Sequence, residues 1–365
     1  MSRYLKIYIL LVVAFMLSFV NSQAVASSTV DNKPLDVRTF ILDHVSDSYQ
    51  WHITTIGDRH ISIPLPVIVY SNTTGWHVFM SSKFHGGHSH DGFIIATEGD
   101  YKGKIVETGA NGSQVKPFDI SITKNVFSLL FSSLLLILII MSVSRSYKKK
   151  GYAPKSGFVA MMEMFIMSIN DDVIKPCIGK QYRKYAPYLL TVFFFVFINN
   201  LMGLIPIFPG GANVTGNIAI TFVLAICTFL IVNIKGSKEY WKEILWPDVP
   251  MWLKFPVPFM PVIELVGILT KPFALMIRLF ANILAGHAIV LGLTALIFVT
   301  VSMGQAMNTS MTVLSVIFSV FISFVELLVA YIQAYIFTML SAVFIGLARV
   351  EPHHVVNKSS TDPSK

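Results

Sequence analysis

The sequence is poor in charged residues. Asp, Glu, Lys and Arg make up only 13% of its 365 residues, whereas an ordinary soluble domain carries about 25%. This shortage, together with 54% hydrophobic residues, argues against a soluble globular protein and predicts a membrane protein. Cysteine is also scarce. Cys177 and Cys227 show no metal-ligand spacing, and we expect two unpaired thiols rather than a disulfide.

Several catalytic and binding motifs are absent as well. There is no G-x-x-x-x-G-K-[ST] loop for a nucleotide and no H-E-x-x-H motif, which an intramembrane metalloprotease would need. We find no internal repeats or discontinuous helices of the kind that a secondary transporter would show. The net charge of +8 does not indicate a nucleic-acid partner, because the basic residues are spread over short loops. We assign no catalytic residue, metal or cofactor.

The first 26 residues have the pattern of a secretory signal peptide. Arg3 and Lys6 precede an apolar run from Ile7 to Val20, and Ala24-Val25-Ala26 is a small-residue cleavage site. The alternative is an uncleaved first transmembrane helix, but the cleavage motif favours removal. Residues 27–122 are therefore expected to lie outside the cytoplasm.

Residues 27–122 are predicted to form a small extracytoplasmic α+β domain or a loosely folded extension. The expected elements are an amphipathic helix over Pro34–His52, strands at Ile61–Ile63, Pro66–Tyr70 and Trp76–Met80, a turn at Ser71–Gly75 and another at Asn111-Gly112. The run from His85 to Asp91 resembles a loose metal-binding tract. A flexible polar loop is the favoured interpretation, so no metal is assigned.

Apolar segments dominate the rest of the chain. They cover Val126–Met141, Pro187–Ile207, Ile218–Ile234, Phe255–Val301 and Met311–Ala348, with an amphipathic stretch over Phe158–Ile169. The loops between them alternate between basic and uncharged. Because basic loops face the cytoplasm, this alternation also places residues 27–122 outside, and it places the C-terminus in the cytoplasm.

The last two apolar segments are about twice as long as the ~20 residues that an upright helix needs. The loop charges require an odd number of crossings in each, so each is expected to be one long, tilted helix. The predicted fold class is an all-α polytopic membrane protein, with upright transmembrane helices plus a long, strongly tilted helical hairpin and a small extracytoplasmic N-terminal region. The expected organisation is a signal peptide (1–26), an extracytoplasmic region (27–122), a transmembrane channel domain (123–350) and a cytoplasmic tail (351–365).

Arg278 is a charged residue at the edge of a long uncharged stretch, because no Asp, Glu, Lys or Arg lies between it and Glu326. Such a residue is unfavourable in a bilayer. A guanidinium keeps its charge in proteins, and near the bilayer centre it costs about 2.5–3.5 kcal/mol or more. Glu264 and Lys271 precede Arg278 at intervals of seven and are predicted to share its helical face. Small or polar residues flank it at helical spacing: Ala274, Ala281, Asn282 and Ala285. These allow another helix to approach closely. We expect an ion pathway; the alternative is a structural helix contact in which Arg278 pairs with Glu326 or another acid.

His287 follows Arg278 by nine residues, which places it on the opposite helical face, and Glu326 on the next helix is its expected partner. An imidazole and a carboxyl group that both exchange protons suit a proton relay. Gln333 follows Glu326 by seven residues and shares its face. For His287 the alternative is a satisfied buried histidine. For Glu264, a candidate for the other access path, the alternative is a carboxylate that reaches the membrane interface.

These residues belong to recognisable motifs. The run from Lys271 to His287, K-P-F-A-L-M-I-R-L-F-A-N-I-L-A-G-H, resembles the signature of subunit a of F-type ATP synthases. Gln333 to Phe337 resembles the last-helix motif of that family, and Asn199 to Pro206 and Gly211 to Thr215 also fit. The resemblance covers about residues 120–350.

The resemblance implies a stator subunit of the bacterial inner membrane that forms two proton half-channels and couples proton translocation to rotation and ATP synthesis. Its implied partners are the c-subunit ring, the b-subunit peripheral stalk, the rest of the ATP synthase complex and the lipid bilayer. It implies that Arg278 faces the c-ring. The positions implied to line the half-channels are Glu264, Asn282, His287, Glu326 and Gln333. Protons are the default ion, although Na⁺ stays open because the ion-binding carboxylate belongs to the c subunit.

Two features depart from the pattern of some relatives. There the position of His287 carries an acid and that of Glu326 a histidine, so this sequence keeps the pair with its members exchanged. Gly203 stands where some relatives carry an aspartate, so any role of that carboxylate is absent or moved in this chain.

Overall fold

A computed structural model gives the fold. The residues that it describes are 41, 46–56, 59–97, 99, 101–108, 114–150, 156–205, 208, 210–245 and 259–349. The predicted signal peptide, the Asn111-Gly112 turn and the tail 351–365 lie outside these residues. The chain divides into two compact units. The first comprises residues up to 131 with 205–212 and 288–321, and the second comprises 132–204, 213–287 and 322–365.

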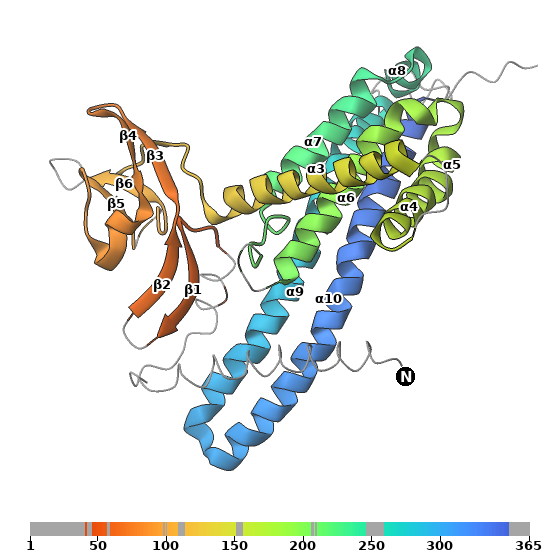
Figure 1. Ribbon diagram of the computed structural model, residues 1–365. Coiled ribbons are helices and arrows are strands. Elements are labelled where there is room, and N and C mark those ends of the chain that lie inside the picture. Colours follow the sequence, from red (N-terminus) through yellow and green to blue (C-terminus); the bar gives the residue numbers. More distant parts are fainter. Residues whose placement is uncertain are drawn as a thin grey trace, which may run out of the picture. The chain divides into compact units, whose positions relative to one another are not determined.

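Short strands build the N-terminal part of the first unit (Figure 1). They are β1 (Gln50–Ile56), β2 (Arg59–Pro64), β3 (Pro66–Ser71), β4 (Gly75–Met80), β5 (Phe93–Ile95), β6 (Ile105–Thr108), β7 (Gln114–Val115) and β8 (Phe118–Asp119), and the 3₁₀-helix η2 covers Ser81–Gly87. The strands pair antiparallel in three sheets, with the orders β1-β2, β4-β3-β8 and β5-β6-β7.

The β3–β4 hairpin carries one side of the small core. Val67 and Val69 alternate with outward residues along β3, as the period of two in a strand requires, and both are fully buried. They pack against Phe84, Phe93 and Ile105. The predicted strands at 61–63, 66–70 and 76–80 are confirmed. The turn between β3 and β4 is confirmed too, with Ser71 paired to Gly75, which has a φ of 84°.

The predicted helix over Pro34–His52 is wrong at its C-terminal end, because Gln50–His52 begin β1. Tyr49 and Trp51 are both buried, at 4% and 5% exposure, so the apolar period here is two rather than 3.6. The β-branched run from Ile53 to Ile56 that follows also favours a strand. Within its described residues the N-terminal region is a folded, strand-rich structure rather than a loose extension, and most of the predicted helix lies outside these residues.

Helices form the rest of the described chain. They are α3 (Lys124–Lys150), α4 (Phe158–Ser168), the π-helical η3 (Ile169–Ile174), α5 (Lys175–Ile178), the 3₁₀-helix η4 (Gly179–Gln181), α6 (Tyr182–Leu204), α7 (Ile218–Ile234), α8 (Lys238–Leu245), α9 (Phe259–Thr300), the 3₁₀-helix η6 (Val301–Met303) and α10 (Gln305–Leu347). Four helical stretches of the described chain have the length and composition to cross a membrane: α3, the run from α4 to α6, α9 and α10. α7 is a shorter apolar helix. The predicted polytopic helical membrane fold is confirmed.

The long helices differ from expectation at their ends. The amphipathic stretch and the second predicted span form one continuous run, Phe158–Leu204. The loop expected over Ser302–Ser310 is much shorter, because Gly304, with a φ of 105°, reverses the chain and α10 already begins at Gln305. A glycine reaches this φ without steric cost, so a few residues suffice for the turn. α9 and α10 have 42 and 43 residues and are each about 63 Å long at 1.5 Å per residue.

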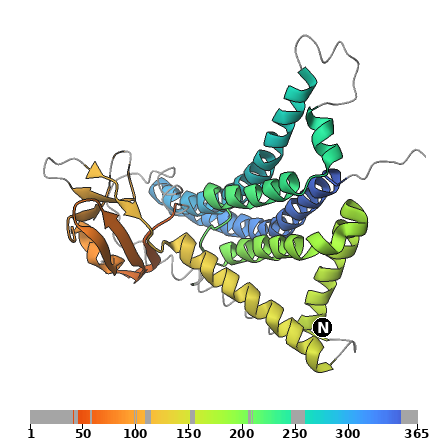
Figure 2. The same ribbon diagram turned by 90° about the horizontal axis from the view of Figure 1, so that it is seen from above.

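α6 is the central helix of the second unit. It lies beside α10 in both views (Figures 1 and 2), and Leu189, Phe193 and Val196 on it are fully buried. Polar contacts are embedded in this apolar packing. The Asn200 amide donates to the Ala330 carbonyl of α10 (3.2 Å) and its oxygen accepts from Thr215 (2.7 Å). Away from water, such polar groups require partners within the protein, and Asn200 has two.

We expect Asn200→Leu to destabilise the second unit, because it removes both hydrogen bonds and leaves the buried Thr215 hydroxyl without its acceptor. Hydrogen bonds between membrane helices are worth roughly 0.6 kcal/mol on average and up to about 1.7 kcal/mol, so a loss of about 1–2 kcal/mol is expected. Thermal unfolding in detergent measures it. The matched control is Thr191→Val, whose exposed hydroxyl bonds only to Pro187 of its own helix. Equal melting temperatures of the two variants would contradict the inter-helix role of Asn200.

Candidate functional site

Around Arg278, α9 has one buried face and one exposed face. Leu275 and Leu279 are almost fully buried, at 2% and 1% exposure. Arg278 itself is exposed. So are the small or polar residues around it, Ala274, Ala281, Asn282 and Ala285. Within this chain, the small-residue strip around Arg278 is therefore open to another helix.

Arg278 makes no ion pair with any residue in the described part of the chain. The alternative in which it pairs with Glu326 is not found, because Glu326 contacts His287 instead. An arginine that keeps its charge in an apolar helix, without a counter-ion among the described residues, calls for one from outside them. The position of Arg278 on the open face of α9 leaves it accessible to such a group.

His287 and Glu326 come together as their pattern predicts. Nδ1 of His287 lies 3.5 Å from Oε1 of Glu326, and the two side chains are 20% and 13% exposed. This Oε1 atom is buried and accepts no hydrogen bond from a described residue. The separation exceeds that of a good hydrogen bond but is within the range of an ion pair when His287 is protonated.

Gly286 permits this approach. A Cβ atom at position 286 would lie 2.4 Å from Oε1 of Glu326 and 3.2 Å from its Cδ and Cγ. Non-bonded heavy atoms normally stay about 3.5 Å or more apart, so a Cβ at this position would require the Glu326 carboxylate to move. Gly286 belongs to the Lys271–His287 motif, but its spacing in the sequence predicts no role for it. The role of this glycine becomes visible only in the structure, where the Glu326 side chain on α10 lies against it.

The other predicted residues are spread along the two helices. Gln333 is buried, with 5% of its surface exposed, whereas Asn282 lies one turn from Arg278 on the open face. The structure thus unites His287 with Glu326, but it places Arg278 and Asn282 on a different face of α9.

Glu264, Lys271 and Arg278 do not share one environment, although they were predicted to share a face. Lys271 is half-buried, and its Nζ lies 5.7 Å from the centre of the Phe344 ring on α10. Glu264 is also half-buried, and Arg278 is exposed. In a straight helix, residues seven apart are offset by about 20° around the helix axis. Over the two intervals from Glu264 to Arg278 this offset adds up to about 40°.

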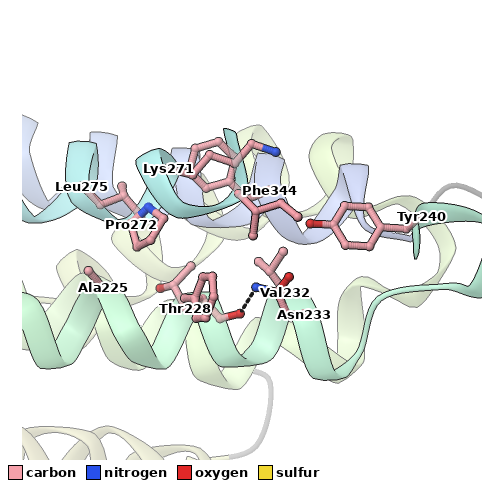
Figure 3. A pocket seen from close by; sticks show the side chains of 11 residues that line it. Ala225, Thr228, Val232, Asn233, Tyr240, Lys271, Pro272, Leu275 and Phe344 are labelled. Carbon is pink, nitrogen blue, oxygen red and sulfur yellow. Dashed lines mark hydrogen bonds between the residues drawn. The ribbon is translucent and has the colours of Figure 1, made fainter. Parts of the chain in front are cut away.

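A pocket lies beside Lys271, between α7, α8, α9 and α10 (Figure 3). It holds about 260 Å³ of space with its mouth included, and its enclosed part has room for about one water molecule. The Tyr240 hydroxyl points into it, while the Asn233 amide nitrogen donates to Phe229. Tyr240 Oη and Asn233 Oδ1 are buried and have no hydrogen-bond partner among the described residues.

Tyr240 is also linked electrostatically to Glu264. Burial raises the pKa of Tyr240, and the negative charge of Glu264 raises this pKa further. Tyr240 therefore stays a neutral hydroxyl that can both donate and accept a hydrogen bond. Sequence reasoning missed Tyr240 and Asn233, because neither lies in a quoted motif and their convergence depends on how α7 and α8 pack.

Comparison with known proteins places this geometry in a family. The family model described as "ATP synthase A chain" matches residues 126–346, and a second model, "Domain of unknown function (DUF8433)", matches residues 40–124. "ATP synthase subunit a 2" of Chlorobaculum tepidum is 44% identical over 246 residues, which are 64% of this chain and 65% of that protein.

Two further relatives extend the likeness. "ATP synthase subunit a" of Chloroherpeton thalassium is 41% identical over 249 residues, which are 66% of this chain and 70% of the relative. "ATP synthase subunit a 2" of Prosthecochloris aestuarii is 37% identical over 299 residues, or 76% and 86% of the two chains. The first of the three relatives is thus matched over slightly less than two thirds of its length. The family model nevertheless covers more than half of this chain, and the protein therefore belongs to the ATP synthase subunit a family, a membrane-sector component of that complex.

Proposed function

We propose that this chain forms the two proton half-channels of an ATP synthase membrane sector and, with a ring of c subunits, couples proton translocation to rotation and ATP synthesis. The observation that carries the proposal is the placement of two ionisable residues of α9 on different faces of the helix. One group, Arg278, faces outward without a counter-ion among the described residues, and another, His287, is paired inside with Glu326.

The His287–Glu326 pair suits the entrance half-channel. A neutral carboxyl beside a neutral imidazole and a carboxylate beside an imidazolium both have zero net charge. Moving a proton between the two partners therefore leaves no isolated charge in the apolar interior, where such a charge is strongly unfavourable. Protonation of both members creates the unstable state from which a proton is passed on, and loss of the shared proton creates the unstable state that takes up the next one. Gln333, seven residues along α10, is proposed to line the same path.

Arg278 is proposed to act as a barrier and an attractant. Its fixed positive charge repels protons that would pass directly between the half-channels. It also draws an ionised carboxylate of the c-ring toward the open face of α9, where the small residues let the ring helix approach. Asn282, one turn away, contributes hydrogen-bonding capacity on this face. Each charge that crosses carries about 2.3 kcal/mol per 100 mV of membrane potential.

The pocket beside Lys271 is proposed to belong to the exit half-channel. Glu264 supplies a polar group near the N-terminal end of α9, and so do the oxygens of Tyr240 and Asn233, which have no hydrogen-bond partner among the described residues. A water molecule with two to four polar partners is stable in such a space. This favours a route for protons between Arg278 and the membrane surface.

We also propose the arrangement that the loop charges predict. Residues 27–122 lie outside the cytoplasm after removal of residues 1–26, the channel domain covers 123–350 in the bacterial inner membrane, and the tail 351–365 lies in the cytoplasm. Besides the c-ring, the proposed partners are the b-subunit peripheral stalk and the other subunits of the complex. Purification of the native complex, with identification of the subunits that accompany this chain, tests the partners directly.

Arg278→Ala is expected to abolish coupled proton transport and ATP synthesis while leaving assembly intact, because the side chain makes no ion pair within the described chain. ATP-driven acidification of membrane vesicles measures the coupling, and the subunit content of the purified complex measures assembly. Arg278→Lys, which retains a positive charge but can deprotonate, is the informative comparison and is expected to restore at most part of the activity. Normal ATP-driven pumping by Arg278→Ala would overturn the assignment.

Gly286→Ala is expected to lower the rate of proton transport by about one to two orders of magnitude, since a misplacement of about 1 Å at a reacting group has effects of this size. The new Cβ pushes the Glu326 carboxylate away from His287 by about that distance. Gly267→Ala is the matched control on the same helix, because a Cβ there meets nothing within 4 Å. Both variants gain the same helix propensity, so equal pumping rates in the two would show that the spacing of the pair is not needed.

A further inference from the structure

One face of the β4-β3-β8 sheet is apolar and uncovered. Along β4, exposed residues alternate with partly buried ones, and the exposed ones include Trp76 at 60% and Val78 at 70%. On β8 and just after it, Phe118 is 64% exposed and Ile120 is 51% exposed. The opposite face holds Val67 and Val69 in the core, so this outer face has no packing role within the described chain.

The strand register arranges these side chains in rows. Tyr70 on β3 pairs with Trp76 on one side and with Phe118 on the other, which makes an aromatic row across the sheet. The Tyr70 and Trp76 rings lie 5.1 Å apart. In the next row, Ile68 lies between Val78 and Ile120, whose N–H donates to the Ile68 carbonyl.

The two rows form an exposed apolar patch whose area is larger than a soluble protein normally leaves exposed. An aromatic side chain has about 150–250 Å² of surface, so Trp76 and Phe118 together expose about 200–300 Å² before the aliphatic residues are added. Contiguous apolar patches of more than a few hundred Å² mark a contact with a membrane or a partner protein. Neither of the two exposed rows contains a charged side chain.

The sheet is fixed directly to the beginning of α3. Past β8, the Ile122 N–H donates to the Pro66 carbonyl, and the Lys124 N–H at the start of α3 donates to the Ser48 carbonyl. The neighbouring β1-β2 sheet is attached to the same helix, because Trp51 of β1 packs edge-on against Phe127 in the first turns of α3, with ring centres 5.9 Å apart. No flexible linker separates the sheet from the helix, so the sheet is held at the depth at which α3 enters the membrane.

We propose that this sheet face rests on the bilayer, in the leaflet at which α3 begins, and that the aromatic row lies at the level of the lipid headgroups. Tryptophan and tyrosine prefer this interface because their rings are apolar while their N–H and O–H groups remain near water. The exposed apolar surface also continues along the chain into α3, where Val126 and Leu130 are 40% and 54% exposed. This gives the strand-rich region the role of a membrane-surface anchor. The inference is independent of the proton path.

Spin-label accessibility tests the proposal in the full-length chain, assembled in its complex and reconstituted in bilayer discs of phosphatidylcholine and phosphatidylglycerol. Cys177 and Cys227 are first replaced by alanine, and a nitroxide is then attached at Val78→Cys or, separately, at Ile120→Cys. Collision with oxygen, which concentrates in lipid, is compared with collision with a water-soluble nickel chelate. Lys104→Cys, exposed between β5 and β6, is the water-facing control, and Leu134→Cys, 55% exposed on α3, is the lipid-facing control.

We expect both sheet labels to resemble the Leu134 label, with high oxygen and low nickel accessibility. Nickel accessibility equal to that of the Lys104 label would place the face in water and overturn the proposal. Low accessibility to both reagents would also overturn it, because it would show that the face is covered by protein, either another subunit or a second copy of this chain.

Discussion

Inside a lipid bilayer, a polar side chain without a partner is far less stable than one that is paired, and this constraint sorts the polar residues of the chain into two groups. Asn200 on α6 finds its donors and acceptors within the second unit and stabilises the packing of the helices. Arg278 finds no counter-ion in the described chain, and Glu326 keeps a buried oxygen without a hydrogen bond. Arg278 and Glu326 lie where proton transfer is proposed, so the packing of the helices around α9 positions these two groups as much as it stabilises the fold.

Much of the helical architecture follows from the sequence, because the boundary between lipid and water determines both where long apolar runs lie and where charged loops lie. The His287–Glu326 contact was predictable for the same reason, since two ionisable residues in adjoining apolar helices have few other partners. The interruption of α4–α6 by a π-helical turn and the early start of α10 were not predictable, because they depend on local backbone geometry such as the positive φ of Gly304. Gly286 and Tyr240 were missed because their roles depend on side chains from other helices.

The N-terminal region illustrates a different difficulty. Its strands at β3 and β4 were visible as alternating and β-branched residues, but Tyr49 and Trp51 were assigned to a helix because the preceding residues have a helical apolar spacing. The change of period occurs within a few residues, and only the burial of both rings shows where it occurs. The apolar outer face was likewise hidden in the sequence. Trp76, Val78, Phe118 and Ile120 come from strands more than 35 residues apart, and the sheet register alone brings them together.

The length of α7 has a consequence for the membrane itself. With 17 residues it spans about 25 Å, whereas the hydrocarbon layer is about 30 Å thick. Such hydrophobic mismatch is relieved when the bilayer thins around the short helix, at a fraction of a kcal/mol per Å. α7 lines the pocket that contains Asn233 and Tyr240, so thinning of the bilayer around α7 would bring the headgroups and their water closer to this pocket. In the proposed exit half-channel, the short helix would thus reduce the depth of apolar material that a proton crosses, without any additional charged residue in the protein.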